Sequence, residues 1–252
     1  MNTIVNFSFW PNYGKDRDMA ESNKIKMAVL IGMGGRLKAI CDCVRDIPNI
    51  EIVAVVSHKP ESPGIEWAKG QGLNAFYFRL SDISPRAESR ADNNSEIANK
   101  EIGNDIGNLE THRQRFNLAI ADKLKALGVN FIVMAGWNIV MNDDFLKRFP
   151  GQVINIHPSL LPSFPGPWNL VSRQVLESGV RFTGCTLHFV PDSGVDSGPI
   201  ILQAVISVEQ DETIETLRKK MDVEEEKLLR EGTKLFAEGK LKIEGKKVII
   251  LP

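Results

Sequence analysis

Residues 26–56 read KMAVLIGMGGRLKAICDCVRDIPNIEIVAVV, and this stretch decides the fold. Short apolar runs at Met27–Ile31 and Ile52–Val56 are typical of strands. Between these runs, apolar residues recur at the three-and-four spacing of a helix, at Leu37, Ile40 and Val44. Strand, helix and strand in this order form a βαβ unit, which predicts a parallel sheet.

The same alternation continues along the chain. We expect a weak strand around residues 75–78, a helix from about Thr111 that ends near Gly128, and a long helix over residues 213–237. Further strands are predicted at residues 131–135, 153–156, 185–190 and 200–206, followed by a small hairpin around residues 244–245. The pattern predicts an α/β fold with a doubly wound, mostly parallel sheet and a C-terminal helix.

One domain accounts for most of the 252 residues. Residues 1–25 have no apolar signal core, and we interpret them as a disordered N-terminal extension. Residues 82–110 are rich in Ser, Asn, Asp and Glu, which predicts a mostly mobile insert in the catalytic domain, residues 26–252.

Composition narrows the possible partners. A formal net charge of -1 provides no bulk attraction to nucleic acid or to an anionic membrane, and the longest apolar runs are only strand-sized. The three cysteines, Cys41, Cys43 and Cys185, fit neither a disulfide framework nor a zinc spacing, so we expect a cytoplasmic protein without a metal.

The segment INIHPSLLP at residues 154–162 is the densest chemical signal, because it runs from a buried strand into a proline-stiffened loop. Strand side chains alternate faces, so Asn155 and His157 point the same way at the carboxyl end of the sheet, where open α/β folds bind ligands. Their N–H groups can converge on one oxygen. Taken alone, the segment also fits a hydrogen-bonded Asn and a core His that close a strand.

A second loop, DSGVDSGPII at residues 192–201, precedes another apolar strand. Asp196 is the expected partner of His157, where a carboxylate would raise the pKa of the imidazole and help it stabilise an oxyanion. For Asp192, an ordinary turn role is preferred, since Asp before Ser-Gly commonly caps turns.

Four motifs in order, NIHPSLLP at 155–162, FPG at 164–166, TGCTLHFV at 183–190 and VDSGPII at 195–201, resemble the phosphoribosylglycinamide formyltransferases within the folate-dependent formyltransferases. The resemblance implies a Rossmann-like formyltransferase fold with an antiparallel strand. It implies transfer of a formyl group from 10-formyltetrahydrofolate to the amine of glycinamide ribonucleotide, in de novo purine synthesis, without a covalent enzyme intermediate. Asn155, His157 and Asp196 would be the catalytic trio.

The resemblance also implies two binding regions. The folate pocket falls on Arg113, the run Asn138, Ile139, Val140 and Met141, and Asp192 near the pterin. The ribonucleotide phosphate falls on Gly34, Gly35 and Arg36, where this chain departs from the family pattern Gly-x-Gly-Ser-Asn-Leu. Glycines before a helix still offer backbone N–H groups to an anion, and Arg36 is predicted to replace the missing donors. His188 is also a family position, although a histidine on an apolar strand is more often structural.

Two other functions remain open. An amino-sugar N-formyltransferase shares the Asn-x-His and Asp motifs, and a catalytically silent folate- or nucleotide-binding module could share the fold. A methionyl-tRNA formyltransferase or a formyltetrahydrofolate deformylase would need a further domain that we do not expect here. The predicted partners are small-molecule substrates, with neither nucleic acid nor membrane, and the sequence does not indicate the oligomeric state.

Overall fold

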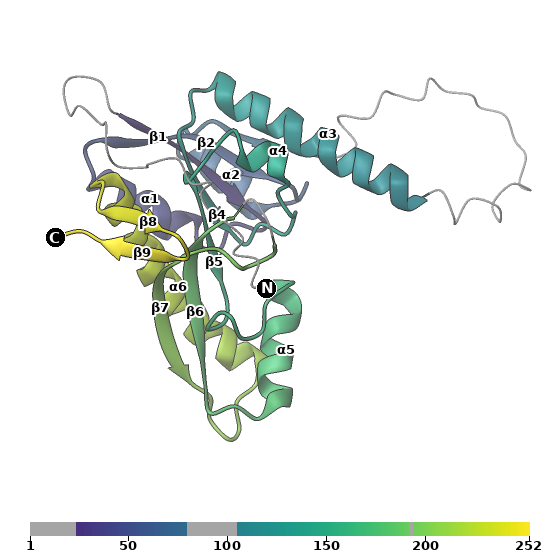
Figure 1. Ribbon diagram of the computed structural model, residues 1–252, viewed down its shortest axis with the longest axis vertical. Helices are drawn as coiled ribbons and strands as arrows, with labels where there is room; N and C mark the ends of the chain where they lie inside the picture. Colours follow the sequence, from purple (N-terminus) through teal and green to yellow (C-terminus); the bar gives the residue numbers. More distant parts are fainter. Residues whose placement is uncertain (1–23, 80–104, 192–193) are drawn as a thin grey trace, which may run out of the picture.

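The computed structural model of the chain describes residues 24–79, 105–191 and 194–252 (Figure 1). Within these ranges, nine strands form one sheet in the order β3-β2-β1-β4-β5-β6-β7-β9-β8. The strands are β1 Ile25–Ile31, β2 Ile50–Ser57, β3 Ala75–Tyr77, β4 Phe131–Ala135, β5 Val153–His157, β6 Phe182–Phe189, β7 Ile200–Ser207, β8 Leu241–Glu244 and β9 Lys247–Ile250. The helices are α1 Leu37–Arg45, α2 Pro63–Gly70, α3 Asp105–Ala126, α4 Asp143–Leu146, α5 Trp168–Ser178 and α6 Ile214–Ala237.

Strand directions confirm the predicted fold class. The five strands from β3 to β5 run parallel, whereas β6 is antiparallel to both of its neighbours, β5 and β7. The terminal hairpin joins the sheet where Lys247 of β9 pairs with Ile200 of β7.

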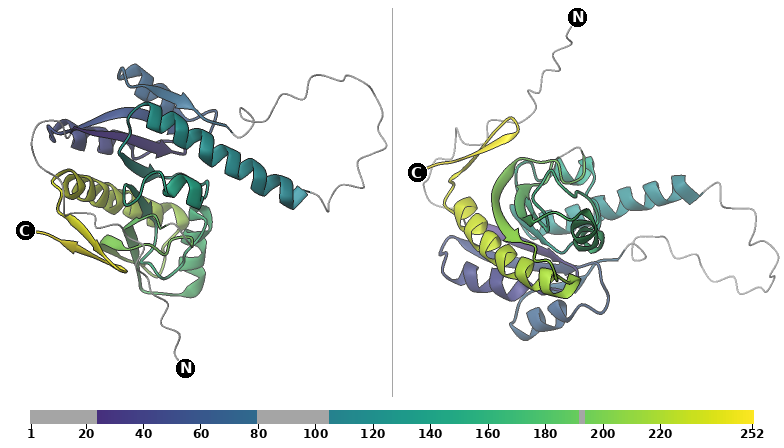
Figure 2. Two further views of the ribbon diagram at one scale, coloured as in Figure 1. Left: turned by 45° about the horizontal axis from the view of Figure 1, so that its top comes forward. Right: turned by 90° about the horizontal axis from the view of Figure 1, so that it is seen from below.

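Helices cover both faces of the sheet. Alternate residues of β1 enter two buried clusters: Met27, Val29 and Ile31 pack with α1, α5 and α6, whereas Ala28 and Leu30 pack with α3 and α4. Figure 2 shows α1 and α6 side by side, with α3 projecting from the other face. The central strands β1, β4 and β5 are therefore largely buried on both sides, as their continuous apolar runs require.

Several element boundaries differ from the sequence prediction. Strand β1 begins at Ile25, and helix α3 begins at Asp105, so the C-terminal end of the predicted 82–110 insert is helical. Helices α2, α4 and α5 were not predicted. The extension expected over residues 1–25 and the rest of the insert lie almost entirely outside the described residues.

The chain order reverses between β1 and β4, the position at which open α/β sheets usually bind ligands. From β1 the chain adds β2 and β3 on one side, and it then returns through α3 to add β4 and β5 on the other. Such a reversal opens a crevice at the carboxyl ends of the strands. The strand ends are close there, because a Cβ on Gly32 would lie 2.5 Å from the carbonyl oxygen of Gly136.

Candidate active site

Asn155 and His157 lie on one face at the end of β5. The antiparallel register places Asn155 opposite His188 and His157 opposite Thr186 on β6. The side chains of Asn155, His157 and His188 all line one cavity, of about 430 Å³. The predicted alternation along β5 therefore places both groups at the cavity.

Both ring nitrogens of His157 have neighbours, and the ring is almost wholly buried. Its Nε2 donates to the carbonyl oxygen of Phe164 at 2.9 Å, because a carbonyl can only accept. Its Nδ1 lies 3.4 Å from Oδ2 of Asp196. The Nε2–H is thus engaged by a carbonyl, and Nδ1 faces a carboxylate.

Asp196 connects two loops of the active site by a hydrogen bond. Its Oδ2 accepts a hydrogen bond from the backbone N–H of Gly166 at 2.8 Å, which joins the loop before β7 to the loop after β5. Both Asp196 and Phe164 have positive φ angles, of 51° and 52°, which non-glycine residues rarely adopt. These two uncommon conformations occur at the residues that contact His157, as is frequent at functional sites.

A buried network fixes the loop that follows β5. The hydroxyl of Thr186 donates to the carbonyl oxygen of Ser159 at 2.7 Å and accepts from the backbone N–H of Leu161 at 3.0 Å. Gln203 on β7 donates both to the Leu161 carbonyl and to the Thr186 hydroxyl. Hydrogen bonds from β6 and β7 therefore fix the loop that contains the Phe164 carbonyl.

His188 orients Asn155, a role that the sequence did not indicate. Its Nδ1 donates to the carbonyl oxygen of Phe189 at 2.9 Å, and burial lowers its pKa, so the ring is neutral and Nε2 is an acceptor. Nε2 lies 3.2 Å from Nδ2 of Asn155, which must donate one N–H to it. The structural interpretation of His188 was therefore incomplete: it also lines the cavity and lies 3.8 Å from Asp196.

The residues expected to bind folate divide into three groups. All four members of the run 138–141 line the 430 Å³ cavity. Arg113, on α3, is exposed and is not among the residues that line it. Asp192 lies outside the described residues.

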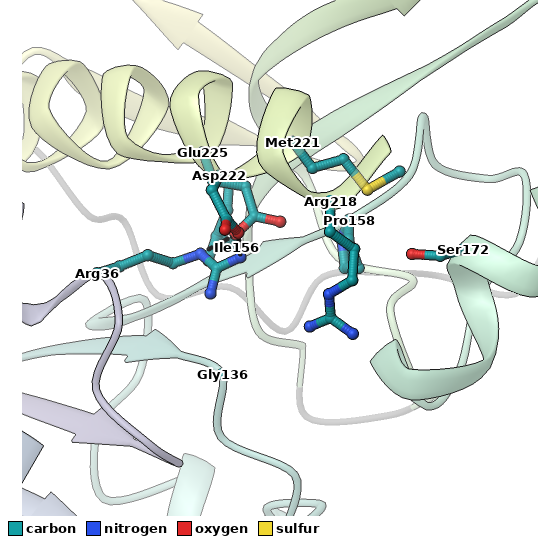
Figure 3. Close-up of a pocket in the computed structure, with 9 residues that line it drawn as sticks. All are labelled: Arg36, Gly136, Ile156, Pro158, Ser172, Arg218, Met221, Asp222 and Glu225. Carbon is teal, nitrogen blue, oxygen red and sulfur yellow. Dashed lines mark hydrogen bonds and ion pairs between the residues drawn. The ribbon is translucent and has the colours of Figure 1, made fainter. Parts of the chain in front are cut away.

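A second, smaller pocket of about 30 Å³ adjoins the first, with which it shares Gly136, Ile156 and Pro158. Figure 3 shows Arg36 reaching from the start of α1 toward Asp222 and Glu225 of α6, with Arg218 beside them. Arg36 Nη2 lies 2.5 Å from Oδ1 of Asp222, and its Nε contacts the carboxylate of Glu225. Arg36 thus lines the pocket, but its guanidinium already has two carboxylate partners.

Glu225 is the buried member of this group. Its side chain is 3% exposed, against 52% for Asp222, and burial raises its pKa to about 7 although Arg36 opposes the rise. Sequence reasoning did not find either carboxylate, because they are ordinary members of an acidic helix, MDVEEE at residues 221–226.

Gly34 and Gly35 are not among the residues that line either pocket. Gly34 has a φ of 86°, and a Cβ on it would lie 2.6 Å from the Cα of Gly64 at the start of α2. Gly34 is therefore required where two backbone segments meet. A Cβ on Gly35 would meet nothing within 4 Å.

Within the described ranges, no three His, Cys, Asp or Glu side chains are grouped so that they could hold a metal ion. Among the helices of those ranges, none has the length and apolar character needed to cross a membrane.

Known proteins of related sequence and structure share this architecture. The profile of the family described as formyl transferase matches residues 25–233. Phosphoribosylglycinamide formyltransferase of Haemophilus influenzae is 33% identical over 221 residues, which cover 86% of this chain and 90% of that protein. The trifunctional purine biosynthetic protein adenosine-3 of Bos taurus is 32% identical over 88% of this chain, which spans only 19% of that protein's length.

Among solved structures, glycinamide ribonucleotide transformylase 1 from Symbiobacterium toebii has a TM-score of 0.76 and 35% identity. The match covers 94% of this chain and 99% of that one. Since the family profile spans most of its length and these relatives match it nearly throughout, the chain belongs to the formyl transferase family.

Proposed function

We propose that the protein transfers the formyl group of 10-formyltetrahydrofolate to the amine of glycinamide ribonucleotide, a step of purine synthesis. The observation that carries the proposal is the arrangement of the two pockets. Asn155, His157 and Asp196 line the larger one, and the smaller, charged pocket shares a wall with it. Two substrates bound side by side would thus meet at the three polar groups.

The larger cavity suits a formyl folate. Its volume of about 430 Å³ and its many apolar residues, among them Val140 and Met141, match the flat ring system of a folate. Polar edges of that ring can bond to the backbone of the run 138–141. We assign the folate tail to the region of Arg113, where a guanidinium can meet carboxylates.

The reaction needs no nucleophile from the protein. The substrate amine attacks the formyl carbon, a new C–N bond forms, and the carbonyl oxygen becomes an oxyanion. The bond to the folate nitrogen then breaks, and that nitrogen takes up the proton that the amine gives away. The protein must hold the reactants, stabilise the oxyanion and conduct one proton.

Asn155 and His157 are the proposed oxyanion donors. One N–H of the Asn155 amide is held by His188, which leaves the second N–H to the oxyanion. His157 is the second proposed donor through Nδ1, which lies on the side of Asp196. Asp196, anchored by the Gly166 N–H, keeps the ring in place and can carry the amine proton through a water.

The smaller pocket is the proposed site of the ribonucleotide. Its wall carries two arginines, Arg36 and Arg218, which suit a phosphate. The backbone at Gly34 and Gly35 precedes α1, whose N-terminus favours an anion as well. With its three buried thiols free, the chain suits a reducing compartment, and we place it in the cytoplasm.

One experiment tests the function directly. The protein is incubated with 10-formyltetrahydrofolate and, separately, with glycinamide ribonucleotide or a panel of amino-sugar nucleotides, and the formylated product is identified by mass spectrometry. Formylation of the ribonucleotide supports the proposal. Formylation of an amino-sugar nucleotide alone would replace it, and folate binding without any turnover would identify a silent binding module.

A further inference from the structure

The two carboxylates that hold Arg36 differ in a way that bears on substrate choice. Glu225 is buried and lies against Nε of the guanidinium, so it cannot turn to water. Asp222 is 52% exposed and meets the terminal Nη2 at 2.5 Å. An exposed carboxylate loses little when it leaves an ion pair, because water takes over its solvation. Asp222 is therefore the exchangeable partner and Glu225 the fixed one.

The small volume of the pocket favours such an exchange. The part of the pocket between the side chains, about 30 Å³, holds roughly one water molecule, so a phosphate that reaches Arg36 must displace neighbouring groups. The Arg36 and Asp222 side chains occupy the space between α1 and α6, as Figure 3 shows. Opening of their contact would enlarge the pocket and free guanidinium N–H donors at once.

The charge balance indicates what enters. Two arginines, Arg36 and Arg218, and two acids, Asp222 and Glu225, line the pocket, so the four groups sum to zero when all are ionised. Displacing Asp222 toward solvent leaves the wall with an excess of positive charge. A phosphate is the group that gains most from this change, since a guanidinium binds its oxygens in pairs.

We propose that Asp222 is a specificity-determining residue of the smaller pocket: its carboxylate competes with the phosphate of the amine substrate for the guanidinium of Arg36. This inference rests on the proposed function, which places a phosphorylated amine in that pocket. Asp222 thereby limits the affinity for the substrate and excludes anions too weak to displace it.

Calorimetric titration with ribose 5-phosphate tests the competition without the need for turnover. Asp222→Asn keeps the shape and removes the charge, and Asp222→Ser removes the contact as well. We expect either variant to bind the sugar phosphate about two- to fivefold more tightly than the wild type, the range of an exposed ion pair. Arg36→Gln should weaken binding about tenfold or more. In the Arg36→Gln background, Asp222→Asn should no longer tighten it.

Glu224→Gln is the matched control, because it removes the same charge two residues along α6, from a side chain that pairs with Lys227 and does not line the pocket. Its dissociation constant should equal that of the wild type. The proposal would be overturned if Glu224→Gln tightened the binding of the sugar phosphate as much as Asp222→Asn does, or if Asp222→Asn still tightened it in the Arg36→Gln background. Either result would mean that the effect comes from the net charge of the protein. Unchanged or weaker binding by both Asp222 variants would overturn it as well.

Kinetics separate this inference from the proposed function. With glycinamide ribonucleotide as substrate, Asp222→Asn should lower the KM for the ribonucleotide and leave the KM for the folate unchanged. If the ribonucleotide is not formylated but the calorimetric pattern holds, the proposed function fails and Asp222 controls another phosphorylated ligand. If the ribonucleotide is formylated and the pattern is absent, the inference about Asp222 fails alone.

Discussion

At the scale of single residues, His157 donates Nε2–H to the Phe164 carbonyl, and its Nδ1 lies 3.4 Å from the Asp196 carboxylate. The alternation of β5 and the acidic loop before β7 made Asn155, His157 and Asp196 predictable from the sequence. The contacts of Phe164 and His188 were not predictable, because they depend on a positive φ and on the register between β5 and β6.

The contacts of His157 lead to a kinetic prediction. His157→Ala should lower kcat by about 100- to 1000-fold, the usual cost of losing one oxyanion donor. Asp196→Asn should cause a loss of similar size, because it removes the carboxylate that holds His157 and accepts the amine proton. Steady-state kinetics with the formyl folate measure the loss, and circular dichroism checks that the variants are folded. Because Asp196 acts partly through His157, the double variant should lose less than the product of the two single losses.

A suitable control is Asp211→Asn, an exposed carboxylate in the turn before α6, which should retain full turnover. The assignment of the trio would be wrong if either active-site variant kept more than half of the wild-type kcat.

At the scale of elements, the parallel strands were the most predictable feature, since their burial on both faces requires uninterrupted apolar runs. Helix α2 was not predicted, because its first two residues are Pro63 and Gly64, and both residue types are typical of loops. A glycine is needed at position 64 because of a tertiary contact: a Cβ on Gly64 would lie 2.8 Å from the Cα of Gly34. No local pattern contains that contact.

A glycine in α6 offers a test of helix-on-sheet packing. A Cβ on Gly232 would lie 2.0 Å from Cδ2 of Leu187, a fully buried side chain of β6. Gly232→Ala gains up to about 1 kcal/mol of helix propensity but forces a repacking that typically costs about 1–3 kcal/mol. We expect a net loss of stability, measured by urea denaturation.

Gly70→Ala is the matched control at the end of α2, where an added Cβ would meet nothing within 4 Å. It should equal or exceed the wild type in stability. If Gly232→Ala were as stable as Gly70→Ala, α6 would not pack against β6 as closely as described.

At the scale of the whole molecule, the smaller pocket lies where the start of α1, the ends of β4 and β5, α5 and α6 come together, and α6 supplies both of its acids. The sequence identified the ends of this arrangement, the Gly-Gly-Arg turn and the Asn-x-His strand. The contact between Glu225 and Arg36 could not be predicted from the sequence, because it depends on how α6 crosses the sheet. Two ion pairs of Arg36, with Asp222 and Glu225, thus link α6 to the N-terminal βαβ unit.

Because the carboxyl of Glu225 is buried, the free energy of unfolding should depend on pH through this residue. Burial raises the pKa of its carboxyl from 4.5 to about 7 in the folded chain. Between these two values the folded state holds a proton that the unfolded state has lost, so this contribution is fully present below pH 4.5 and disappears as the pH rises through about 7.

Comparison of the wild type with Glu225→Gln isolates this contribution, since the other titrating groups are common to both proteins. From pH 5 to pH 8, the stability of the wild type should fall relative to that of the variant by at most about 3 kcal/mol, at 1.36 kcal/mol per pKa unit. Urea denaturation at unit steps of pH measures the difference. Parallel curves for the two proteins would mean that Glu225 is ionised in the folded state throughout this range, and a fall of the variant relative to the wild type would mean that Arg36 outweighs burial.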